Sequence, residues 1–386
     1  MVTNSRFEFA TATRVIFGAG CLRDFKPSEL GRKALVVGGR NSDRAAPLLE
    51  ILKRDGVSSG IFNIAGEPTV DAVTQGVAQA RQSTSDFVIS IGGGSVIDCG
   101  KAIAALLTNG GNALDYLEVI GKAKPLINPP VPFIAIPTTA GTGAEVTRNA
   151  VLASLEHRVK VSLRSSLMLP RLALVDPELT SDLPRSLTAS TGMDALTQLI
   201  EPYVCIRANP ITDSLCVDGI GRVARSLRRA WDVSSDMEAR TDMSIASLFS
   251  GMALANAGLG AVHGFAAAIG GMFSAPHGAI CAALLPHVME ANIAALQRRQ
   301  SAPESLGRYR QIARLLTGNP NAASKDCVAW VRQLCRDFGI PGLGSYGIAP
   351  KDVPLICEKA SVASSMKANP VVLDPATLQE VLTRAL

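Results

Sequence analysis

The sequence predicts two unlike halves: an α/β half with a mostly parallel sheet at residues 1–184, and an all-helical half at residues 185–386. In the first half, short apolar runs alternate with helix-like segments, a pattern typical of parallel strands joined by crossover helices. Beyond Leu183-Pro184, long segments rich in Ala, Leu and Ile have helical spacing and almost no strand signal. The 386 residues, of which 47% are hydrophobic and 18% charged, suffice for two folded domains.

The first half contains regularly alternating elements. Residues 6–20 alternate polar and apolar side chains, as in an edge strand or hairpin. After it we expect strands at 33–37, 58–64, 87–89 and 132–136, and helices at about 43–53, 70–81 and 95–107. The interleaved order favours a sheet covered by helices on both faces.

Three glycines, Gly92–Gly94, follow the apolar run Phe87–Ile89, and Ser95 can cap the helix that comes next. Glycines let the backbone approach a ligand closely, and a helix start attracts an anion. The turn therefore predicts a phosphate cradle. The alternative is a tight strand-to-helix turn that binds nothing.

The helical half contains two histidines in glycine-rich sequence, His263 and His277. On one straight helix they would lie about 21 Å apart, but Pro276 and the preceding glycines can break the helix and fold one back toward the other. Asp194 and Gln198 are spaced to share one helix face. Two imidazoles and a carboxylate suit Fe(II) or Zn(II). The alternative is that these side chains are helix caps or satisfied core residues.

Four segments carry a resemblance to a known family: Gly92–Lys101, Pro137–Thr147, Thr191–Thr197 and Pro276–Gly278. In these segments, which appear in the family's order, the chain resembles the iron-containing (group III) alcohol dehydrogenases from about residue 7 to about residue 370. The resemblance implies a dehydroquinate synthase-like architecture, with an N-terminal dinucleotide-binding domain and a helical, metal-binding domain. It also implies reversible, metal-assisted hydride transfer between a nicotinamide cofactor and a small alcohol or aldehyde.

The resemblance also assigns roles to individual residues. By position, it implies that Gly93, Gly94 and Ser95 hold the pyrophosphate, that Asp98 lines the nicotinamide side, that Thr138, Thr139 and Thr142 contact the cofactor, that Lys160 reaches its ribose, and that Asp194, His263 and His277 are metal ligands. Asp98, His263 and His277 form the expected catalytic group.

The chain departs from the family's pattern at three positions. Gln198 stands where the family has a fourth metal ligand, a histidine, and its neutral amide oxygen is a weaker donor. Ala267 replaces a further histidine near the reaction centre, and Ala144 replaces a serine. A weakly bound iron, a zinc ion, or no metal, as in the related maleylacetate reductases, all stay open.

The residues after strand 33–37 favour NADP(H) over NAD(H). An acidic side chain at such a strand end accepts the ribose 2′-hydroxyl in NAD-preferring proteins, but this chain has no carboxylate before Asp43. Gly38, Gly39 and Ser42 leave room for a 2′-phosphate, and Arg40 can pair with it. The alternative is that Arg40 is solvated and Asp43 serves the ribose.

Composition excludes several classes of partner. The net charge of +5 comes without a basic cluster interleaved with aromatic residues, so we expect no nucleic acid. We also expect no signal peptide and no membrane span. Eight scattered cysteines predict reduced thiols in the cytoplasm. By resemblance, we expect a homo-oligomer, dimeric or larger.

The rival functions are a metal-independent reductase of the maleylacetate type, a dehydroquinate synthase-like lyase and a non-catalytic nucleotide-binding relative.

Overall fold

The structure is a computed structural model that describes residues 6–154, 156–157, 159–299 and 303–386. These residues form two compact units. An α/β unit comprises Thr11–Thr139 with the described part of Gly143–Asp182. A helical unit comprises residues 6–10, Ala140–Thr142 and the described part of Leu183–Leu386.

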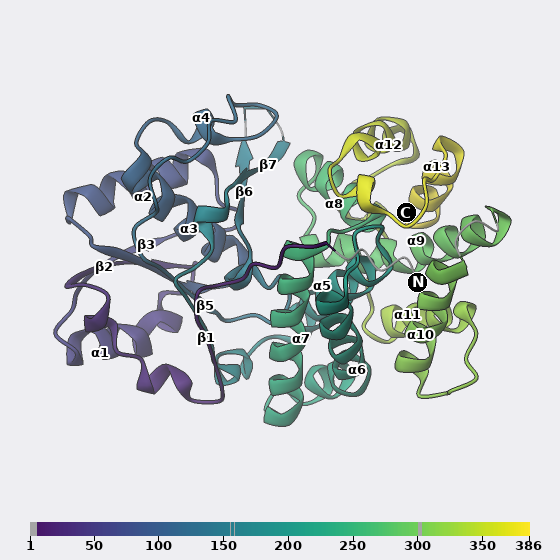
Figure 1. Cartoon of the computed structure of the whole chain (residues 1–386), viewed down its shortest axis with the longest axis horizontal. Helices are drawn as coiled ribbons and strands as arrows, with labels where there is room; N and C mark the ends of the chain where they lie inside the picture. The colour runs from purple at the N-terminus through teal and green to yellow at the C-terminus, as the bar shows by residue number, and fades with distance from the viewer. Residues whose placement is uncertain (1–5, 155, 158, 300–302) are drawn as a thin grey trace. The chain divides into compact units, whose positions relative to one another are not determined.

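The α/β unit is built on a six-stranded sheet in the order β1-β8-β5-β4-β2-β3 (Figure 1). The strands are β1 (Val15–Phe17), β2 (Lys33–Gly38), β3 (Ser58–Asn63), β4 (Phe87–Gly92), β5 (Phe133–Pro137) and β8 (Leu172–Val175). Every neighbouring pair is parallel. The predicted α/β fold class is therefore confirmed.

Helices cover both faces of the sheet because successive strand residues point to opposite sides. The helices of this unit are α1 (Ala46–Arg54), α2 (Val70–Gln82), α3 (Gly94–Asn109) and the short α4 (Ala113–Tyr116). Leu35 and Val37 pack in one apolar cluster with residues of α2 and α3. Val36, between them, packs in a second cluster with Leu48 and Leu52 of α1.

The sequence interpretation missed three strands of this unit. β6 (Asn149–Ser154) and β7 (Val159–Arg164) form an antiparallel hairpin that packs against α3. β8 pairs with β1 at the edge of the main sheet, so residues 6–20 contribute a single edge strand and no hairpin. The predicted Ser95 cap was also wrong, because α3 begins at Gly94 and Gly93 occupies its N-cap position.

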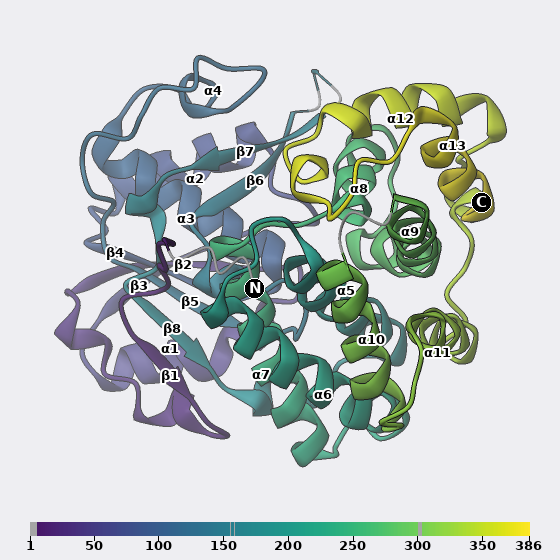
Figure 2. The same ribbon diagram turned by 45° about the vertical axis from the view of Figure 1, so that its right-hand side comes forward.

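The second unit is helical, as predicted. Its helices are α5 (Arg185–Val204), α6 (Pro210–Asp232), α7 (Met237–Asn256), α8 (Ala261–Met272), α9 (His277–Arg299), α10 (Pro303–Thr317), α11 (Ser324–Asp337), α12 (Val353–Val362) and α13 (Pro375–Arg384). α5 is buried on all sides from Gly192 onward and packs against α6, α7 and α9 (Figure 2). A helix that is buried on all sides is expected at the centre of such a bundle.

The helical unit contains one helix that is long and apolar enough to cross a membrane. The segment His277–Arg298 of α9 passes by length and composition, and α7 with α8 passes as a pair bent by 94°. In the α9 window, 72% of the residues are buried inside the protein. This degree of burial fits a core helix.

Candidate functional site

The two glycine-rich turns of the α/β unit meet at one place. β2 lies between β3 and β4 in the sheet. The chain passes from β2 to β3 on one side, and then crosses to β4 on the other side of β2. Gly38, the last residue of β2, pairs with Ile91 of β4, directly before Gly92–Gly94. The carboxyl ends of strands at such a reversal point form the usual ligand crevice of open parallel sheets.

The turn after β4 brings the end of β4, the start of α3 and the segment after β5 close together. The Val96 and Ile97 amides donate to the Gly93 carbonyl, at 3.0 and 3.1 Å, and so start α3. Thr138, just after β5, donates its amide to the Gly92 carbonyl at 3.0 Å. A Cβ on Gly92 would lie 2.7 Å from Val96, whereas one on Gly93 would lie 3.5 Å from Thr139. Gly92 is thus required by packing, but Gly93 is not.

The structure therefore places several predicted cofactor residues side by side. Gly93, Gly94 and Ser95 form the start of α3, and Thr138 and Thr139 lie beside them. A helix start with glycine backbone can bind a phosphate.

The segment after β2 is open to solvent. Arg40 and Ser42 are exposed, and the Asn41 side chain accepts a hydrogen bond from the Asp43 amide at 3.0 Å. Next to it, a cavity of about 170 Å³ is lined by Asp43, Arg44, Pro47, Thr138, Glu178, Leu179, Ser181 and Asp182. Arg44 and Asp182 form an ion pair at 2.9 Å across its wall. This cavity lies at the same carboxyl edge of the sheet as the glycine turns.

Three further predicted residues have other surroundings. Asp98, half-buried on α3, accepts the Val151 amide at 3.0 Å, and its second oxygen lies 3.8 Å from Lys101 Nζ. Lys160 of β7 lies 3.2 Å from the Glu67 carboxylate. Thr142 groups with the helical unit, whereas the glycine turn belongs to the α/β unit.

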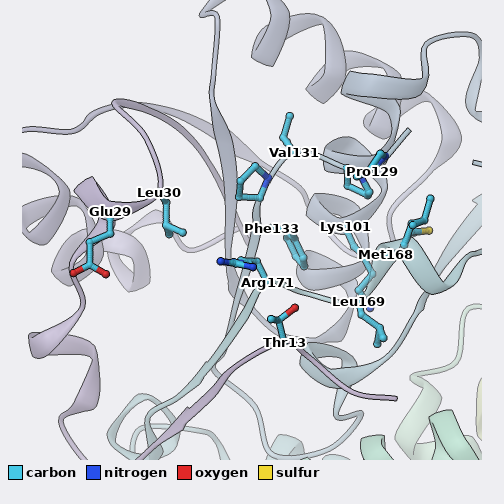
Figure 3. A pocket seen from close by; sticks show the side chains of 13 residues that line it. Thr13, Glu29, Leu30, Lys101, Pro129, Val131, Phe133, Met168, Leu169 and Arg171 are labelled. Atoms are coloured by element: carbon cyan, nitrogen blue, oxygen red, sulfur yellow. The ribbon is translucent and has the colours of Figure 1, made fainter. Parts of the chain in front are cut away.

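The larger cavity of the α/β unit lies elsewhere. It has about 410 Å³ and is lined by the segment before β5, by Lys101 of α3 and by the loop before β8 (Figure 3). These are the amino ends of β5 and β8, away from the glycine turns. The Lys101 ammonium in its wall already donates to the Ala144 and Asn149 carbonyls and to the Thr147 hydroxyl, at 2.8–2.9 Å. This cavity is therefore a poorer candidate for an anionic cofactor.

In the helical unit, α5 presents one row of buried polar side chains. Asp194, Gln198 and Glu201 are spaced by four and three residues, so they share a helix face. All three are buried, at 2%, 2% and 4% exposure. Buried charges are costly unless they are paired or bind a metal, so this row marks a site.

Two local features bring the histidines to that row. α8 ends at Met272, the chain turns at Phe273–Pro276, and His277 is the first residue of α9. A Cβ on Gly278 would lie 2.2 Å from the Ser190 carbonyl of α5, so only glycine permits this close approach of α9. As a result, the His263 and His277 rings lie 5.4 Å apart, far closer than on one straight helix.

The two imidazoles converge on Asp194. His263 Nε2 and His277 Nε2 each lie 3.6 Å from Asp194 Oδ1. On its other side, His263 Nδ1 donates to the Glu201 carboxylate at 2.7 Å, which orients the ring with Nε2 facing the cluster. Glu201 also accepts the Val262 amide at 2.7 Å. His277 is 38% exposed, so the cluster opens toward solvent on its side.

The charges of the cluster perturb its pKa values. Burial lowers the pKa of His263, but the Cys281 sulfur and the Asp194 and Glu201 carboxylates outweigh it and raise the pKa well above the usual value. The Cys281 sulfur, followed by Asp194, raises the pKa of His277 to about 9 against burial. Burial raises the pKa of Asp194, yet the two imidazoles and Gln198 together bring it below its usual value.

The residues present fit a divalent metal ion. Asp194 Oδ1 and Gln198 Oε1 are buried and have no hydrogen-bond partner among the described residues. Asp194, His263, His277 and Cys281 offer four ligand atoms that all lie within 4.8 Å of one another. A buried carboxylate oxygen left unpaired among converging imidazole and thiol donors matches the ligand chemistry of such metals.

Sequence reasoning missed two members of this cluster, Glu201 and Cys281. Glu201 lies seven residues after Asp194, on the same helix face, so its spacing could have found it. Cys281 follows His277 by one helical turn, but this matters only once the helix is known to begin at His277.

Comparison with known proteins agrees with this architecture. The family model "Iron-containing alcohol dehydrogenase" matches residues 12–177, and the C-terminal model of the Fe-containing alcohol dehydrogenase family matches residues 188–386. The 1,3-propanediol dehydrogenase of Klebsiella pneumoniae is 37% identical over 352 residues, which cover 88% of each chain. The NAD-dependent methanol dehydrogenase of Bacillus methanolicus is 32% identical over 384 residues, which cover 96% of this chain and 97% of that protein.

A solved structure shows the same fold along the whole chain. The crystal structure of a 1,3-propanediol oxidoreductase has a TM-score of 0.91 and 33% sequence identity, and the match covers 99% of this chain and 100% of that one. Both halves of the chain are thus accounted for by one kind of protein. The chain belongs to the iron-containing alcohol dehydrogenase family, whose members are oxidoreductases acting on CH–OH groups.

Proposed function

We propose that this chain transfers a hydride reversibly between NADP(H) and a small alcohol or aldehyde, with the reacting oxygen at the Asp194–His263–His277 cluster. The observation that carries the proposal is the convergence of three donors, two buried and one partly exposed, on one point of the helical unit. A divalent ion held there would act as a Lewis acid on the substrate oxygen. The nicotinamide cofactor would supply or accept the hydride.

The protein's own residues have three tasks in this proposal. Asp194 supplies the negative charge of the cluster, and Glu201 fixes the orientation of the His263 ring through its Nδ1–H. The exposed edge of His277 leaves an approach for the substrate. Ala267 is exposed, and its methyl group cannot transfer a proton. The proton of the reaction therefore exchanges with water through the ribose hydroxyl.

For the cofactor, we assign the pyrophosphate to Gly93, Gly94 and Ser95, with Thr138 and Thr139 beside it. The cavity between Asp43 and Asp182 suits the adenosine end, because it adjoins the same edge of the sheet. Asp98, which accepts the Val151 amide, is assigned to the nicotinamide side. Lys160 is assigned to the ribose, for which it would leave its ion pair with the exposed Glu67. Thr142 is assigned a contact with the cofactor. Residues 1–184 are assigned the dinucleotide, and residues 185–386 the metal and the substrate.

The preference for NADP(H) rests on the end of β2. Gly38 and Gly39 carry no side chain, Arg40 is exposed, and the first carboxylate belongs to Asp43. A Cβ on Gly39 would meet only Val96, at 3.7 Å, so a side chain fits there. Gly39→Asp should therefore fold normally, place a carboxylate for the ribose 2′-hydroxyl and repel a 2′-phosphate.

We expect Gly39→Asp to lower the NADPH-to-NADH ratio of kcat/KM at least about tenfold. Gly39→Asn is the matched control, since it adds the same volume without charge. An NADH preference in the unmodified enzyme, or an unchanged ratio in Gly39→Asp, would reject the assignment.

The experiment that tests the function is an aldehyde and alcohol screen with both nicotinamide cofactors. Short-chain alcohols and diols come first, because two relatives are named for 1,3-propanediol and methanol. Purified enzyme is assayed with Fe(II), with Zn(II) and with a chelator, beside Asp194→Ala. We expect oxidation of NADPH that chelation and Asp194→Ala both abolish. Full activity after chelation would indicate the metal-independent reductase instead, and no turnover would indicate a non-catalytic relative.

Cellular placement and assembly belong to the same proposal. All eight cysteines are free in the structure, as expected for the reducing cytoplasm. Size-exclusion chromatography with light scattering tests the expected dimer or larger homo-oligomer.

A further inference from the structure

One sulfur atom belongs to the cluster on α5, α8 and α9. Cys281 Sγ lies 3.7 Å from His277 Nε2 and 3.9 Å from His263 Nε2. Cys281 is fully buried and lies one turn after His277 on α9, so both side chains point from the same helix face. The thiol thus approaches the same point as the two imidazoles and Asp194.

The four donor atoms have the spacing of a tetrahedral metal site. With metal–nitrogen bonds of about 2.0 Å and a metal–sulfur bond of about 2.3 Å, tetrahedral donors lie roughly 3.5 Å apart. The separations of 3.6 Å to Asp194 and of 3.7 and 3.9 Å to Cys281 are slightly wider. All four ligand atoms lie within 4.8 Å of one another.

Two further observations single out this thiol. First, Asp194 Oδ1, the oxygen that faces both imidazoles, is buried and has no hydrogen-bond partner among the described residues, as expected of a metal ligand in the same cluster. Second, of the eight cysteines, Cys281 is the one that joins a group of metal-binding side chains in the part of the chain that the structure covers. A buried thiol that merely fills the core would require neither an unpaired carboxylate oxygen nor a group of metal-binding side chains beside it.

The geometry points to Cys281 as the fourth protein ligand of the metal, in place of a donor at position 198, and to Zn(II) as the ion that this cluster selects. Gln198 can offer only a neutral amide oxygen, whereas a cysteine loses its proton to solvent on ligation and provides a thiolate. Thiolate donors favour zinc over iron(II), which prefers imidazole and carboxylate. This inference rests on the proposed function only in placing a metal at this cluster.

Cobalt(II) substitution of the full-length protein tests the ligand directly. Co(II) replaces Zn(II) in tetrahedral sites, and a bound thiolate gives it a sulfur-to-metal charge-transfer absorption in the near ultraviolet. We expect this absorption in the unmodified protein and in Cys357→Ala, which removes another buried thiol of the helical unit. Cys281→Ala should lose it. An unmodified protein that binds Co(II) without the absorption would overturn the inference.

Zinc affinity provides the second readout, measured by competition with a chromophoric chelator. We expect Cys281→Ala to weaken zinc binding at least about tenfold, and Cys357→Ala to leave it unchanged. The double variant Gln198→His/Cys281→Ala moves the fourth donor to α5 and should lower the zinc-to-iron(II) affinity ratio relative to the unmodified protein. Equal zinc affinity with and without Cys281, or an unchanged ratio, would overturn the inference.

Two controls keep these outcomes apart. If Cys281→Ala unfolds, Cys281→Val, which fills the same space without a donor, is measured instead, with circular dichroism of the metal-free protein to confirm folding. None of these readouts needs turnover. A protein that binds zinc through Cys281 but reduces no aldehyde would therefore contradict the proposed function alone.

Discussion

The glycine turn of the α/β unit and the donor cluster of the helical unit are built in opposite ways. At the turn, Gly92–Gly94 keep side chains away, and the features that could bind a ligand are backbone amides at the start of α3. In the cluster, every feature is a side chain, and these come from α5, α8 and α9. The first site is contiguous in the sequence, and the second exists only in the folded unit.

This difference predicts different responses to mutation. A site made of backbone is damaged by any added side chain but tolerates changes around it. A site made of side chains depends on each donor, yet the donors can be exchanged if another side chain reaches the same point. By the inference above, Cys281 takes the place of a donor at Gln198: the Gln198 oxygen is buried and unpaired among the described residues, and a thiol one helix away approaches Asp194 and the two imidazoles.

The largest effect is expected from the side chain that orients His263. Glu201→Gln keeps the shape and can still accept the Val262 amide, but it removes the charge that holds the His263 Nδ1–H. Loss of such a partner typically costs 10- to 100-fold in metal affinity, and we expect a zinc affinity lower by roughly that factor. Chelator competition measures it.

Glu238→Gln, an exposed glutamate of α7, is the control for the Glu201 variant. Thermal unfolding of the metal-free proteins separates the positioning role from a structural one. Were Glu201→Gln to unfold earlier while keeping full zinc affinity, Glu201 would serve the fold and not the cluster.

A smaller effect is expected at the glycine turn, where two neighbouring glycines should behave differently. Gly93→Ala adds a Cβ at an ordinary distance of 3.5 Å from Thr139, so stability should change little. The same Cβ would stand between the backbone and a phosphate, so KM for NADPH should rise about tenfold. Gly92→Ala instead forces a Cβ to 2.7 Å from Val96, and should lower the free energy of unfolding by about 1–3 kcal/mol.

Steady-state kinetics and urea unfolding of both glycine variants check this contrast. A Gly93→Ala enzyme with normal KM for both nicotinamide cofactors would show that the phosphate lies elsewhere. Gly92 and Gly93 would then both serve the packing of the turn and not the binding of a phosphate.

Contiguous patterns explain how much of the fold could be predicted from the sequence. β2, β4 and β5 are largely apolar runs because parallel strands are buried on both faces, so each is visible locally. β6 is only half-buried and contains Asn149, Ala150 and Ser154, so it lacks that signal and was missed. β8 has four residues, too few to stand out before the helical half.

In the candidate site, too, residue types could be predicted from the sequence, but their arrangement in space could not. Asp194, His263 and His277 could be proposed because their residue types are uncommon in apolar helices, but their convergence depends on Gly278 fitting against Ser190, a contact across 88 residues of sequence. Cys281 is one of eight scattered cysteines, and nothing in the sequence indicates the register between α9 and α5. The identity of the fourth donor is therefore information that only the packing of α5, α8 and α9 supplies.

The smallest effect concerns a buried ionisable pair that supports the α/β unit. Burial lowers the pKa of Lys101 from 10.5 to about 8 and raises the pKa of Glu145 from 4.5 to about 7. A raised acid stabilises the folded state below its unfolded pKa, so the Glu145 contribution is lost as pH rises from 4.5 to about 7. A depressed lysine contributes above its unfolded pKa, so the Lys101 contribution is lost as pH falls from 10.5 to about 8.

Together, the two groups should make the α/β unit least stable between about pH 7 and 8, where both are charged. Glu145→Gln should remove the decline in unfolding free energy between pH 4.5 and 7, while Glu156→Gln, at an exposed position of the same unit, should keep it. Urea unfolding across this pH range measures both. Parallel curves for Glu145→Gln and the unmodified protein would mean that the buried Glu145 charge is already stabilised by its surroundings. The donors of the helical cluster would be stabilised in the same way by a bound metal.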